Sequence, residues 1–466
     1  MTKQECAIKY ITENYLDYRR LRHDIVADKL QVRLLGDEAK GKRQEYWKEL
    51  SKHDINSIVC HCAQEYDANI TSREVMTALQ SDLIPDVHPL REYINALPRY
   101  TPDQPDWIDF VAQQVRVRES SADRPKGLSE RTACCQTTML LDRPYGAERP
   151  TNLTGEADLT ISEVHGLTSN SSQRERSKAD RLWRACFKKW FVAMVASWMK
   201  DEVVNHQVLV LIGKQGIFKT TWLEHLIPPH LRAYACKLAN SNDLNKDERL
   251  RIAEFGLISL DEIDSMNNRE LNQLKSVITA TDVNERAAYA YTKERRVRLA
   301  SFCASGNRRD FLTDITGNRR WLPFEVESIQ NPFYAIMPYE QMYAQAWTLA
   351  QDPLFSYWFD LEEIEVLEEH NQHFRDESNE EQLLPILFDV PAEGKGEFMT
   401  TAQISERLVT YGNIKKPMAL SRLGMVLGAA GYQSTRPKIG GRLIRGWLVY
   451  QRDTDEIASL KRLLKE

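Results

Sequence analysis

The stretch QVLVLIGKQGIFKTTWLEHLI, residues 207–227, decides the fold. An apolar run comes first, a turn with two glycines follows, and a helix-compatible segment opens at Lys219. This order is the strand, turn and helix of a phosphate-binding P-loop. Gly213 and Gly216 allow backbone N–H groups to turn towards phosphate oxygens, and the helix N-terminus adds a favourable dipole.

The loop supplies candidate ligands for a nucleotide. Lys219 can reach the β- and γ-phosphates of ATP, and the Thr220 hydroxyl can bind Mg²⁺. One residue departs from the pattern G-x-x-x-x-G-K-[ST], because Phe218 stands where the last glycine is usual. That position often takes a backbone conformation that is unfavourable for Phe, so the loop alone leaves open a strand–turn–helix with a solvated lysine. The residues expected to contact ATP are Gly213, Lys214, Gln215, Gly216, Ile217, Phe218, Lys219, Thr220 and Thr221.

Two apolar segments downstream end in polar residues. RIAEFGLISLDEID (251–264) reaches Asp261 and Glu262, and VRLASFCASGN (297–307) reaches Asn307. Beside a P-loop, Asp261 would hold the Mg²⁺ shell and Glu262 would polarise the attacking water. Asn307 could orient that water or sense the γ-phosphate.

A pair of arginines follows in DFLTDITGNRRWLPFEV (310–326), between a glycine turn and an apolar strand. Arg319 or Arg320 could reach the γ-phosphate on a neighbouring subunit and stabilise charge in the transition state. The other interpretation is a structural arginine at the sheet edge, and we expect one of the two to have that role.

The flanking segments predict the surrounding architecture. Between 205 and about 325, apolar strand-like runs alternate with helices, which is typical of a parallel α/β sheet. Residues 181–199, RLWRACFKKWFVAMVASWM, predict a helix whose aromatic side chains lie in the core. Upstream, short helical patterns follow one another, and Thr71 with Glu74 makes a capping-box signature.

Charge is segregated along the chain although the net charge is only −5. Residues 360–393 hold twelve acids against one base, whereas 395–452 hold ten bases against two acids. This switch is typical of an acidic linker followed by a module that faces nucleic acid. The expected domains are a helical N-terminal domain (1–118), a flexible insertion (119–178), an ATPase core (179–330), a helical acidic linker (331–394) and a DNA-binding module (395–466).

The last module has the pattern of a winged helix. Thr400 and Gln403 cap a first helix, Gly431 ends a second, and Gly440-Gly441 turns a hairpin. Its expected apolar core is Ile404, Leu408, Leu420, Leu423, Leu427, Leu443, Trp447 and Val449. Its expected DNA contacts are Arg422 on the second helix and Arg436, Lys438, Arg442 and Arg445 on or beside the wing. A protein-contact role for the module stays open.

Composition excludes several classes of protein. A length of 466 residues predicts two to four domains, and 42% apolar with 28% charged residues is an ordinary globular composition. The longest apolar stretch, 190–199, is half of what a membrane span requires. The first twenty residues hold no apolar signal segment, and the eight cysteines form no C-x-x-C pair. We therefore expect a cytoplasmic protein with reduced thiols and no membrane contact.

The P-loop, DEID (261–264), ASGN (304–307) and TGNRRWLPF (316–324), in this order and spacing, resemble the virulence-associated protein E family. HPLREYINALP (88–98) and KKWFVAMVASWM (188–199) extend the likeness, which covers roughly residues 10–330. The four motifs are specific together and weak singly. Members of that family are helicase-like ATPases of phages and mobile elements, similar to superfamily 3 helicases within the AAA+ class.

The resemblance implies a role for each motif. Lys219 and Thr220 would be Walker A, Asp261 and Glu262 Walker B, Asn307 sensor 1, and Arg319 or Arg320 the arginine finger. VNERAAYAYTKERRVRL (283–299) occupies the place of the family's DNA-contacting hairpin, where bases can stack on aromatic rings and cations can neutralise phosphates. The other reading is a solvated charged hairpin. The candidate contacts there are Tyr289, Tyr291, Lys293, Arg295, Arg296 and Arg298.

The leading hypothesis is an ATP-dependent DNA helicase or replication-initiation ATPase of a phage or mobile element. It would act as a homo-oligomeric ring, expected to be a hexamer, with ATP and Mg²⁺ between subunits. Single-stranded DNA would pass through the channel and duplex DNA would bind the winged helix. Two alternatives stay open: an assembly factor or helicase loader that uses ATP to oligomerise, and a regulatory or antiphage ATPase whose winged helix binds protein.

Overall fold

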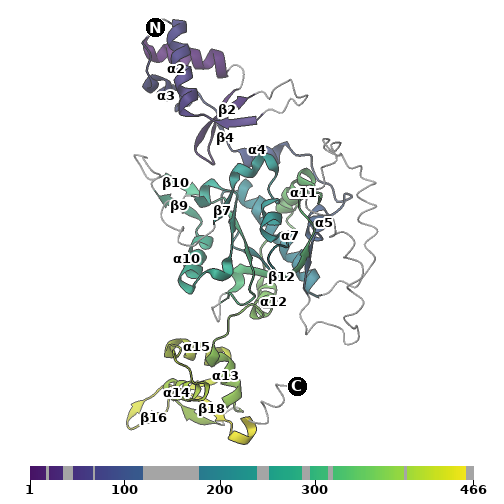
Figure 1. The fold of residues 1–466 in the computed structure, drawn as a ribbon, viewed down its shortest axis with the longest axis vertical. Coiled ribbons are helices and arrows are strands. Elements are labelled where there is room, and N and C mark those ends of the chain that lie inside the picture. Colours follow the sequence, from purple (N-terminus) through teal and green to yellow (C-terminus); the bar gives the residue numbers. More distant parts are fainter. Residues whose placement is uncertain are drawn as a thin grey trace. The chain divides into compact units, whose positions relative to one another are not determined.

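The computed structural model describes residues 1–16, 20–34, 46–66, 69–118, 178–238, 251–285, 294–312, 318–392 and 396–457 (Figure 1). The insertion expected over 119–178 lies outside these ranges apart from its last residue. The chain divides into two compact units, which are described in turn. The first comprises Met1–Glu262, Arg269–Asn307 and Phe324–Phe359, and the second comprises Ile263–Asn268, Arg308–Pro323 and Asp360–Glu466.

The N-terminal part of the first unit combines helices with a four-stranded sheet, which corrects the helical prediction. The strands β1 and β2 form an antiparallel hairpin that pairs Asp24 with Lys29, and the Asp24 carboxylate accepts a 3.0 Å hydrogen bond from the Val26 N–H in the turn. These strands are short and charged, so they show no alternation of apolar residues that could reveal them. The capping box at Thr71 and Glu74 is confirmed. The elements are α1 (Lys3–Ile11), the π-helix η1 (Thr12–Leu16), β1 (Leu21–Asp24), β2 (Lys29–Leu34), β3 (Tyr46–Glu49), α2 (Lys52–Tyr66), α3 (Ser72–Leu79) and β4 (Asp86–Val87).

A six-stranded sheet forms the centre of the first unit. Its order is β5-β12-β6-β11-β8-β7, in which β6, β11, β8 and β7 run parallel and β12 is antiparallel to β5. Every residue of β6, β8 and β11 is buried, which explains why these strands hold only apolar residues, serine and glycine. The predicted parallel α/β sheet is therefore confirmed. The strands are β5 (Val115–Val117), β6 (Val208–Ile212), β7 (Ala235–Leu238), β8 (Leu257–Leu260), β11 (Ser301–Gly306) and β12 (Trp321–Ile329).

The long helix α7 (Lys178–Met199) lies beside this sheet (Figure 1). Trp183, Trp190 and Trp198 on it are fully buried. Each indole N–H donates to a backbone carbonyl, those of Ala112, Phe302 and Gly256 respectively. A buried indole needs such an acceptor, so these residues fix the helix against the sheet, and the prediction that they form core is confirmed.

The remaining elements of the first unit do not belong to this six-stranded sheet. Besides β9 and β10, which form a separate antiparallel pair, they are mainly helical. They are α4 (Pro89–Ala96), α5 (Trp107–Ala112), α8 (Lys219–Glu224), the 3-10 helix η4 (Pro229–Tyr234), α10 (Asn268–Thr279), β9 (Asp282–Glu285), β10 (Glu294–Val297) and α11 (Tyr339–Gln351). No helix in the described ranges is long and apolar enough to cross a membrane.

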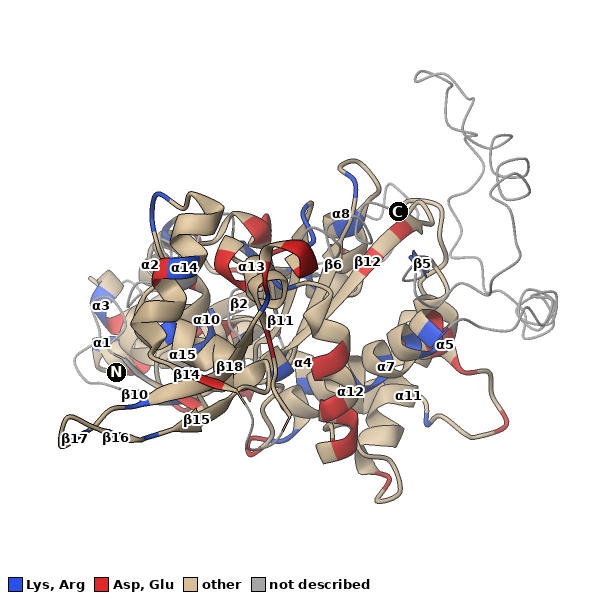
Figure 2. Cartoon of the chain, turned by 90° about the horizontal axis from the view of Figure 1, so that it is seen from below, with Lys and Arg blue, Asp and Glu red and all other residues tan. Residues whose placement is uncertain are grey.

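The second unit holds the two segments of opposite charge. Acidic residues lie on α12 (Leu361–Gln372) and α13 (Asn379–Leu387) (Figure 2). The sheet β13-β18-β14, with β15 also on β18, packs with the helices that follow α12. The elements are η6 (Ile263–Ser265), η7 (Asn318–Arg320), α12 (Leu361–Gln372), α13 (Asn379–Leu387), β13 (Phe388–Asp389), β14 (Glu397–Met399), α14 (Thr401–Gly412), α15 (Leu420–Ala429), β15 (Gln433–Thr435), β16 (Lys438–Ile439), β17 (Arg442–Leu443) and β18 (Gly446–Gln451).

The expected local signals of the last module are present. Thr400 and Gln403 form the capping box of α14, and the β16–β17 hairpin turns at Gly440 and Gly441, whose φ values are 58° and 83°. Gly431 has a φ of 87° and follows the end of α15. These positive φ values explain glycine at each place.

The core of this module differs from the expected one. Leu420 is 48% exposed at the start of α15, and Leu443 is 72% exposed on a strand of two residues, so their predicted burial is wrong. Leu384, Leu387 and Phe388 instead join the buried cluster. The acidic segment therefore contributes a helix and a strand to this core, ahead of the boundary expected at residue 395.

Candidate functional site

A cavity of about 320 Å³ opens at the carboxyl ends of β6, β8 and β11. Because the three strands are parallel, residues that follow each of them meet at the same edge of the sheet. The cavity thereby collects most of the predicted P-loop, both acids after β8 and the asparagine after β11. Its lining is Gln215, Gly216, Phe218, Lys219, Thr220, Thr221, Asp261, Glu262, Ser305, Gly306 and Asn307.

The P-loop backbone explains its glycines and its one departure from the usual pattern. A Cβ on Gly213 would come within 2.7 Å of the Val326 carbonyl oxygen, and Gly216 has a φ of 85°. Phe218 has a φ of 67° and a ψ of 18°, in the left-handed region, directly before α8. The loop therefore keeps the conformation that favours glycine at this position although a phenylalanine occupies it.

Lys219 is only 7% exposed, and its ammonium group lies inside the loop. Its Nζ donates to the carbonyl oxygens of Gly213 (2.8 Å) and Lys214 (2.7 Å) and lies 3.3 Å from the Asn307 amide oxygen. Neutral oxygens thus hold a positive charge at the centre of the loop. This places the charge where phosphate oxygens of a nucleotide would need it.

Asp261 is the centre of a polar cluster. Its Oδ1 accepts hydrogen bonds from the Ser305 hydroxyl (2.7 Å) and the Thr220 hydroxyl (3.2 Å), and the two hydroxyls lie 2.9 Å apart. Its Oδ2 lies 2.8 Å from the Lys237 Nζ. Burial alone would raise the pKa of Asp261, but these hydrogen bonds and the Lys237 charge outweigh it and hold the pKa below its usual value. Asp261 is therefore ionised at neutral pH.

The donor set fits Mg²⁺. The Thr220 hydroxyl and the Asp261 carboxylate offer hard oxygen ligands beside each other, which is the chemistry this ion prefers. Glu262 follows with its side chain exposed and a φ of 55°. Its left-handed backbone is a second strained position at the edge of the cavity.

Sequence reasoning missed two members of the cluster. Ser305 could have been found, because alternation along a strand places it on the same side as Asn307. Lys237 gave no local signal, since it belongs to β7 and meets Asp261 only because β7 pairs with β8. The spatial order of strands is not readable from a run of apolar residues.

The predicted arginine finger falls in the second unit. Arg319 is exposed and Arg320 is half-buried in η7. Burial, with the charge of Arg319, lowers the pKa of Arg320 from its ordinary value. The roles of both residues stay predictions.

The structure describes the base of the predicted DNA-contacting hairpin, where β9 and β10 pair from Glu285 with Glu294 onwards. Tyr289, Tyr291 and Lys293 lie outside the described residues, and so does the side chain of Arg295. The Arg296 guanidinium forms ion pairs with Asp28 and Glu254.

Arg298 corrects the prediction for this hairpin. It is 1% exposed, and its guanidinium donates to the carbonyl oxygens of Ala300 (3.0 Å), Asn205 (2.9 Å) and Ile278. Burial lowers its pKa to about 9. Arg298 holds the turn after α10 to the core, so its predicted contact with DNA is wrong.

Basic side chains gather at the β16–β17 hairpin. Arg436, Lys438, Arg442 and Arg445 are exposed, and the guanidinium of Arg445 lies 5.9 Å from the centre of the Trp447 ring. Arg422 is half-buried on α15. These positions are accessible for phosphate contacts, and their role stays a prediction.

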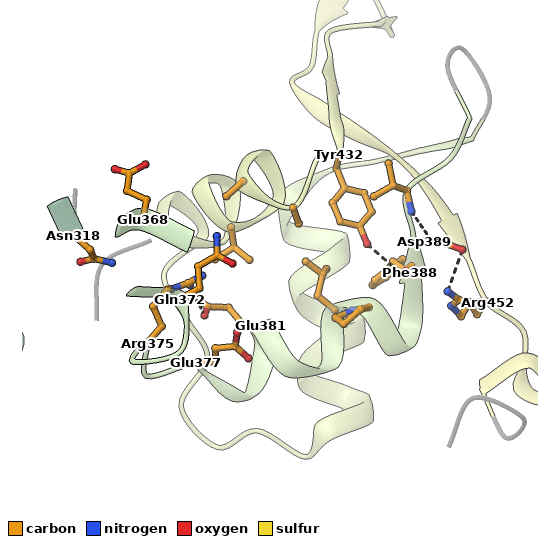
Figure 3. A pocket seen from close by; sticks show the side chains of 16 residues that line it. Asn318, Glu368, Gln372, Arg375, Glu377, Glu381, Phe388, Asp389, Tyr432 and Arg452 are labelled. Carbon is orange, nitrogen blue, oxygen red and sulfur yellow. Dashed lines mark hydrogen bonds and ion pairs between the residues drawn. The ribbon is translucent and has the colours of Figure 1, made fainter. Parts of the chain in front are cut away.

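A second cavity, of about 470 Å³, lies within the second unit between α12, α13 and α15 (Figure 3). Ion pairs join Arg375 to Glu381 and Arg452 to Asp389, each at 3.0 Å. The Tyr432 hydroxyl donates to the Phe388 carbonyl. No residue predicted from the sequence as a site residue lines it.

Comparison with known proteins identifies one domain. Residues 164–376 match the virulence-associated protein E-like domain, so the expected resemblance is confirmed over this part of the chain. No curated protein matches the sequence.

Solved structures of the NrS-1 C-terminal region are similar over most of the chain. Its apo structure is 12% identical with a TM-score of 0.43, and covers 96% of this chain and 100% of that chain. Two A-form apo structures of the same region have 12% and 13% identity and TM-scores of 0.39 and 0.40. They cover 92% and 93% of this chain and 96% and 98% of the other.

Proposed function

We propose that this chain, which carries a virulence-associated protein E-like domain, is an ATP-dependent, helicase-like ATPase of a phage or mobile element. One observation carries the proposal: Lys219, Thr220, Asp261 and Asn307 line a single cavity at the carboxyl edge of a parallel sheet. A buried ammonium beside an ionised carboxylate and a hydroxyl is suited to a nucleotide with its metal. The family match over 164–376 supports the same activity.

Each residue then has a part in hydrolysis. Lys219 binds the β- and γ-phosphates, and Thr220 and Asp261 would hold Mg²⁺. Bound there, Mg²⁺ would neutralise charge on the phosphates. Glu262 orients the attacking water and takes its proton, and Asn307 hydrogen-bonds to that water or to the γ-phosphate.

The same family resemblance supports our proposals for the oligomeric state and for the DNA contacts. The core would be AAA+-like, and Arg319 or Arg320 would act on the nucleotide of a neighbouring subunit in a ring. The hairpin that includes Tyr289, Lys293 and Arg295 would contact single-stranded DNA. The order of helices and strands from β14 to β18, with a glycine turn between β16 and β17, supports a winged helix.

The exposed apolar residues of this module favour a second candidate role for it. Ile439 is 47% exposed and Leu443 is 72% exposed on the two strands of the wing, beside the basic side chains. Apolar side chains exposed together on one hairpin are suited to a protein contact. The chain would then be a loader or regulator that binds a partner protein through the wing.

The test measures ATPase activity with and without single-stranded DNA, beside the native mass. Lys219→Ala should abolish nucleotide binding, because it removes the charge that faces the phosphates. Glu262→Gln should keep binding and stop hydrolysis. Equal ATPase rates in the wild type and both variants would exclude this site, and activity without DNA stimulation would favour the loader.

A further inference from the structure

Both carboxylate oxygens of Asp261 have partners. Hydroxyls of Thr220 and Ser305 donate to Oδ1, and the Lys237 ammonium lies 2.8 Å from Oδ2. A metal ion that binds to Asp261 would thus meet a carboxylate that is already paired with the ammonium group of Lys237.

Lys237 can leave this position. It extends from β7, where it pairs in register with Ser259 of β8, and its side chain is 45% exposed. Glu224 and Glu262 are near enough for their charges to act on it. A long side chain with alternative carboxylates close by can exchange partners with little change in the fold.

A divalent ion and the ammonium disfavour each other on one carboxylate. Two cations within about 4 Å of each other repel, even at the effective dielectric of a partly exposed site. Metal binding to Asp261 is therefore more favourable when Lys237 moves away from Oδ2. Without a metal, Lys237 instead offsets the charge of Asp261, which would otherwise repel a phosphate in the loop.

We infer that Lys237 is a positioning residue that stands in for the metal on Asp261 in the metal-free protein and is displaced when Mg²⁺ binds. The inference rests on the proposed function of the cavity. Lys237 would favour metal-free nucleotide binding and oppose binding of the metal, so it would set the strength of coupling between nucleotide and Mg²⁺.

The experiment measures the dissociation constant of a fluorescent ADP analogue with Mg²⁺ and with EDTA. The quantity compared between variants is the ratio of the dissociation constant in EDTA to that in Mg²⁺. Lys237→Met should increase this ratio by about five- to tenfold, since the substitution weakens metal-free binding of the nucleotide and removes the cation that competes with Mg²⁺. Lys237→Arg keeps the charge and should restore the wild-type ratio.

A matched control removes the same charge elsewhere. Lys29 pairs with Glu49 at 2.7 Å in the N-terminal sheet and is 49% exposed, much like Lys237. Lys29→Met should leave the ratio unchanged, and thermal unfolding of every variant checks the fold.

Two outcomes would overturn the inference in different ways. If Lys237→Met leaves the ratio unchanged or lowers it, Lys237 does not compete with the metal, and the nucleotide site itself stands. If the analogue binds neither the wild type nor any variant, the proposed function fails together with the inference.

Discussion

Phe218 shows how a single residue can keep a loop conformation that usually requires glycine. Its φ of 67° is unfavourable for a side chain by about 1–2 kcal/mol. Phe218→Gly should relieve this, so the affinity for ADP, measured by calorimetry, should hold or rise. Loss of ADP binding in a variant that still folds would show instead that the ring is a required part of the loop.

Ser305 orients Asp261 from the neighbouring strand, with 2.7 Å between its hydroxyl and Oδ1. Ser305→Ala should lower kcat about tenfold, because the carboxylate that would hold Mg²⁺ loses the donor that fixes it. The control is Ser301→Ala on the same strand, where the hydroxyl accepts a hydrogen bond from the Asn205 amide. Steady-state ATPase assays should separate the two variants, and equal rates would remove Ser305 from the site.

At the same scale, the sequence predicts correctly the positions of residues that belong to a recognisable motif. It does not show when the fold buries a charged residue and thereby gives it a structural role. Lys219, Asp261 and Asn307 follow strands within recognisable motifs, and the cavity brings them together. Arg298 belongs to a basic run like its neighbours, yet its carbonyl partners come from α10, the turn after it and Asn205. Charge along a chain does not show which cation the fold buries.

Among the elements, β1 and its turn link two parts of the first unit. The imidazole of His23 contacts the carboxylates of Asp86 (2.8 Å) and Asp28 (3.2 Å), and Asp28 also pairs with Arg296 of β10. Burial would lower the pKa of His23, but the hydrogen bonds to both carboxylates outweigh it and raise the pKa above 6.5. The base of the β9–β10 hairpin is thereby tied to the N-terminal sheet.

This cluster predicts a pH-dependent stability. A raised histidine pKa stabilises the fold below the unfolded value and loses that effect as the pH rises through the folded value. His23→Gln should therefore lower the Tm more at pH 6 than at pH 8, by an amount equivalent to about 1 kcal/mol or less. Thermal unfolding at both values tests this, with His53→Gln on an exposed position of α2 as the control. An equal decrease in Tm at both pH values would refute this prediction.

Elements with a clear pattern of apolar residues are predicted well from the sequence, and short, charged elements are not. The buried strands β6, β8 and β11 are short, mostly apolar runs that end in polar residues, and the helix α7 has a long apolar stretch, so the sequence predicts these elements. β1–β3 have four to six residues each and many charges, so no periodicity reveals them, and the pairing of β1 with β2 depends on the turn at Asp24–Lys29.

At the scale of the whole molecule, an arginine finger predicts complementation between subunits. Arg320→Ala, or Arg319→Ala, should lose ATPase activity alone and regain part of it when mixed with Lys219→Ala subunits. Each variant then supplies what the other lacks across an interface. We expect rescue for Arg320, which abuts the apolar strand β12 and is more buried than Arg319. If neither variant is rescued, catalysis within one subunit becomes the better model.

The extent of the C-terminal core decides where the chain can be divided. A cut at residue 395 would separate Leu384, Leu387 and Phe388 from the cluster that buries them, and it would break the pairing of Phe388 with Gln451. Each such side chain contributes roughly 1.5–3 kcal/mol when buried. A fragment of residues 378–466 should therefore be several kcal/mol more stable in urea unfolding than one of 395–466.

The longer fragment then tests what the basic β16–β17 hairpin binds. Fluorescence anisotropy with labelled duplex DNA should show binding that weakens with salt, by a slope of about −0.9 for each phosphate contact. Arg442→Glu with Arg445→Glu should weaken binding to all sequences, since both cations are exposed on or beside the β16–β17 hairpin. Arg422→Ala on α15 should preferentially relax any sequence preference. If the fragment folds and binds no DNA even at low salt, the result would favour the protein-contact role for this hairpin, for which the exposed side chains of Ile439 and Leu443 are suited.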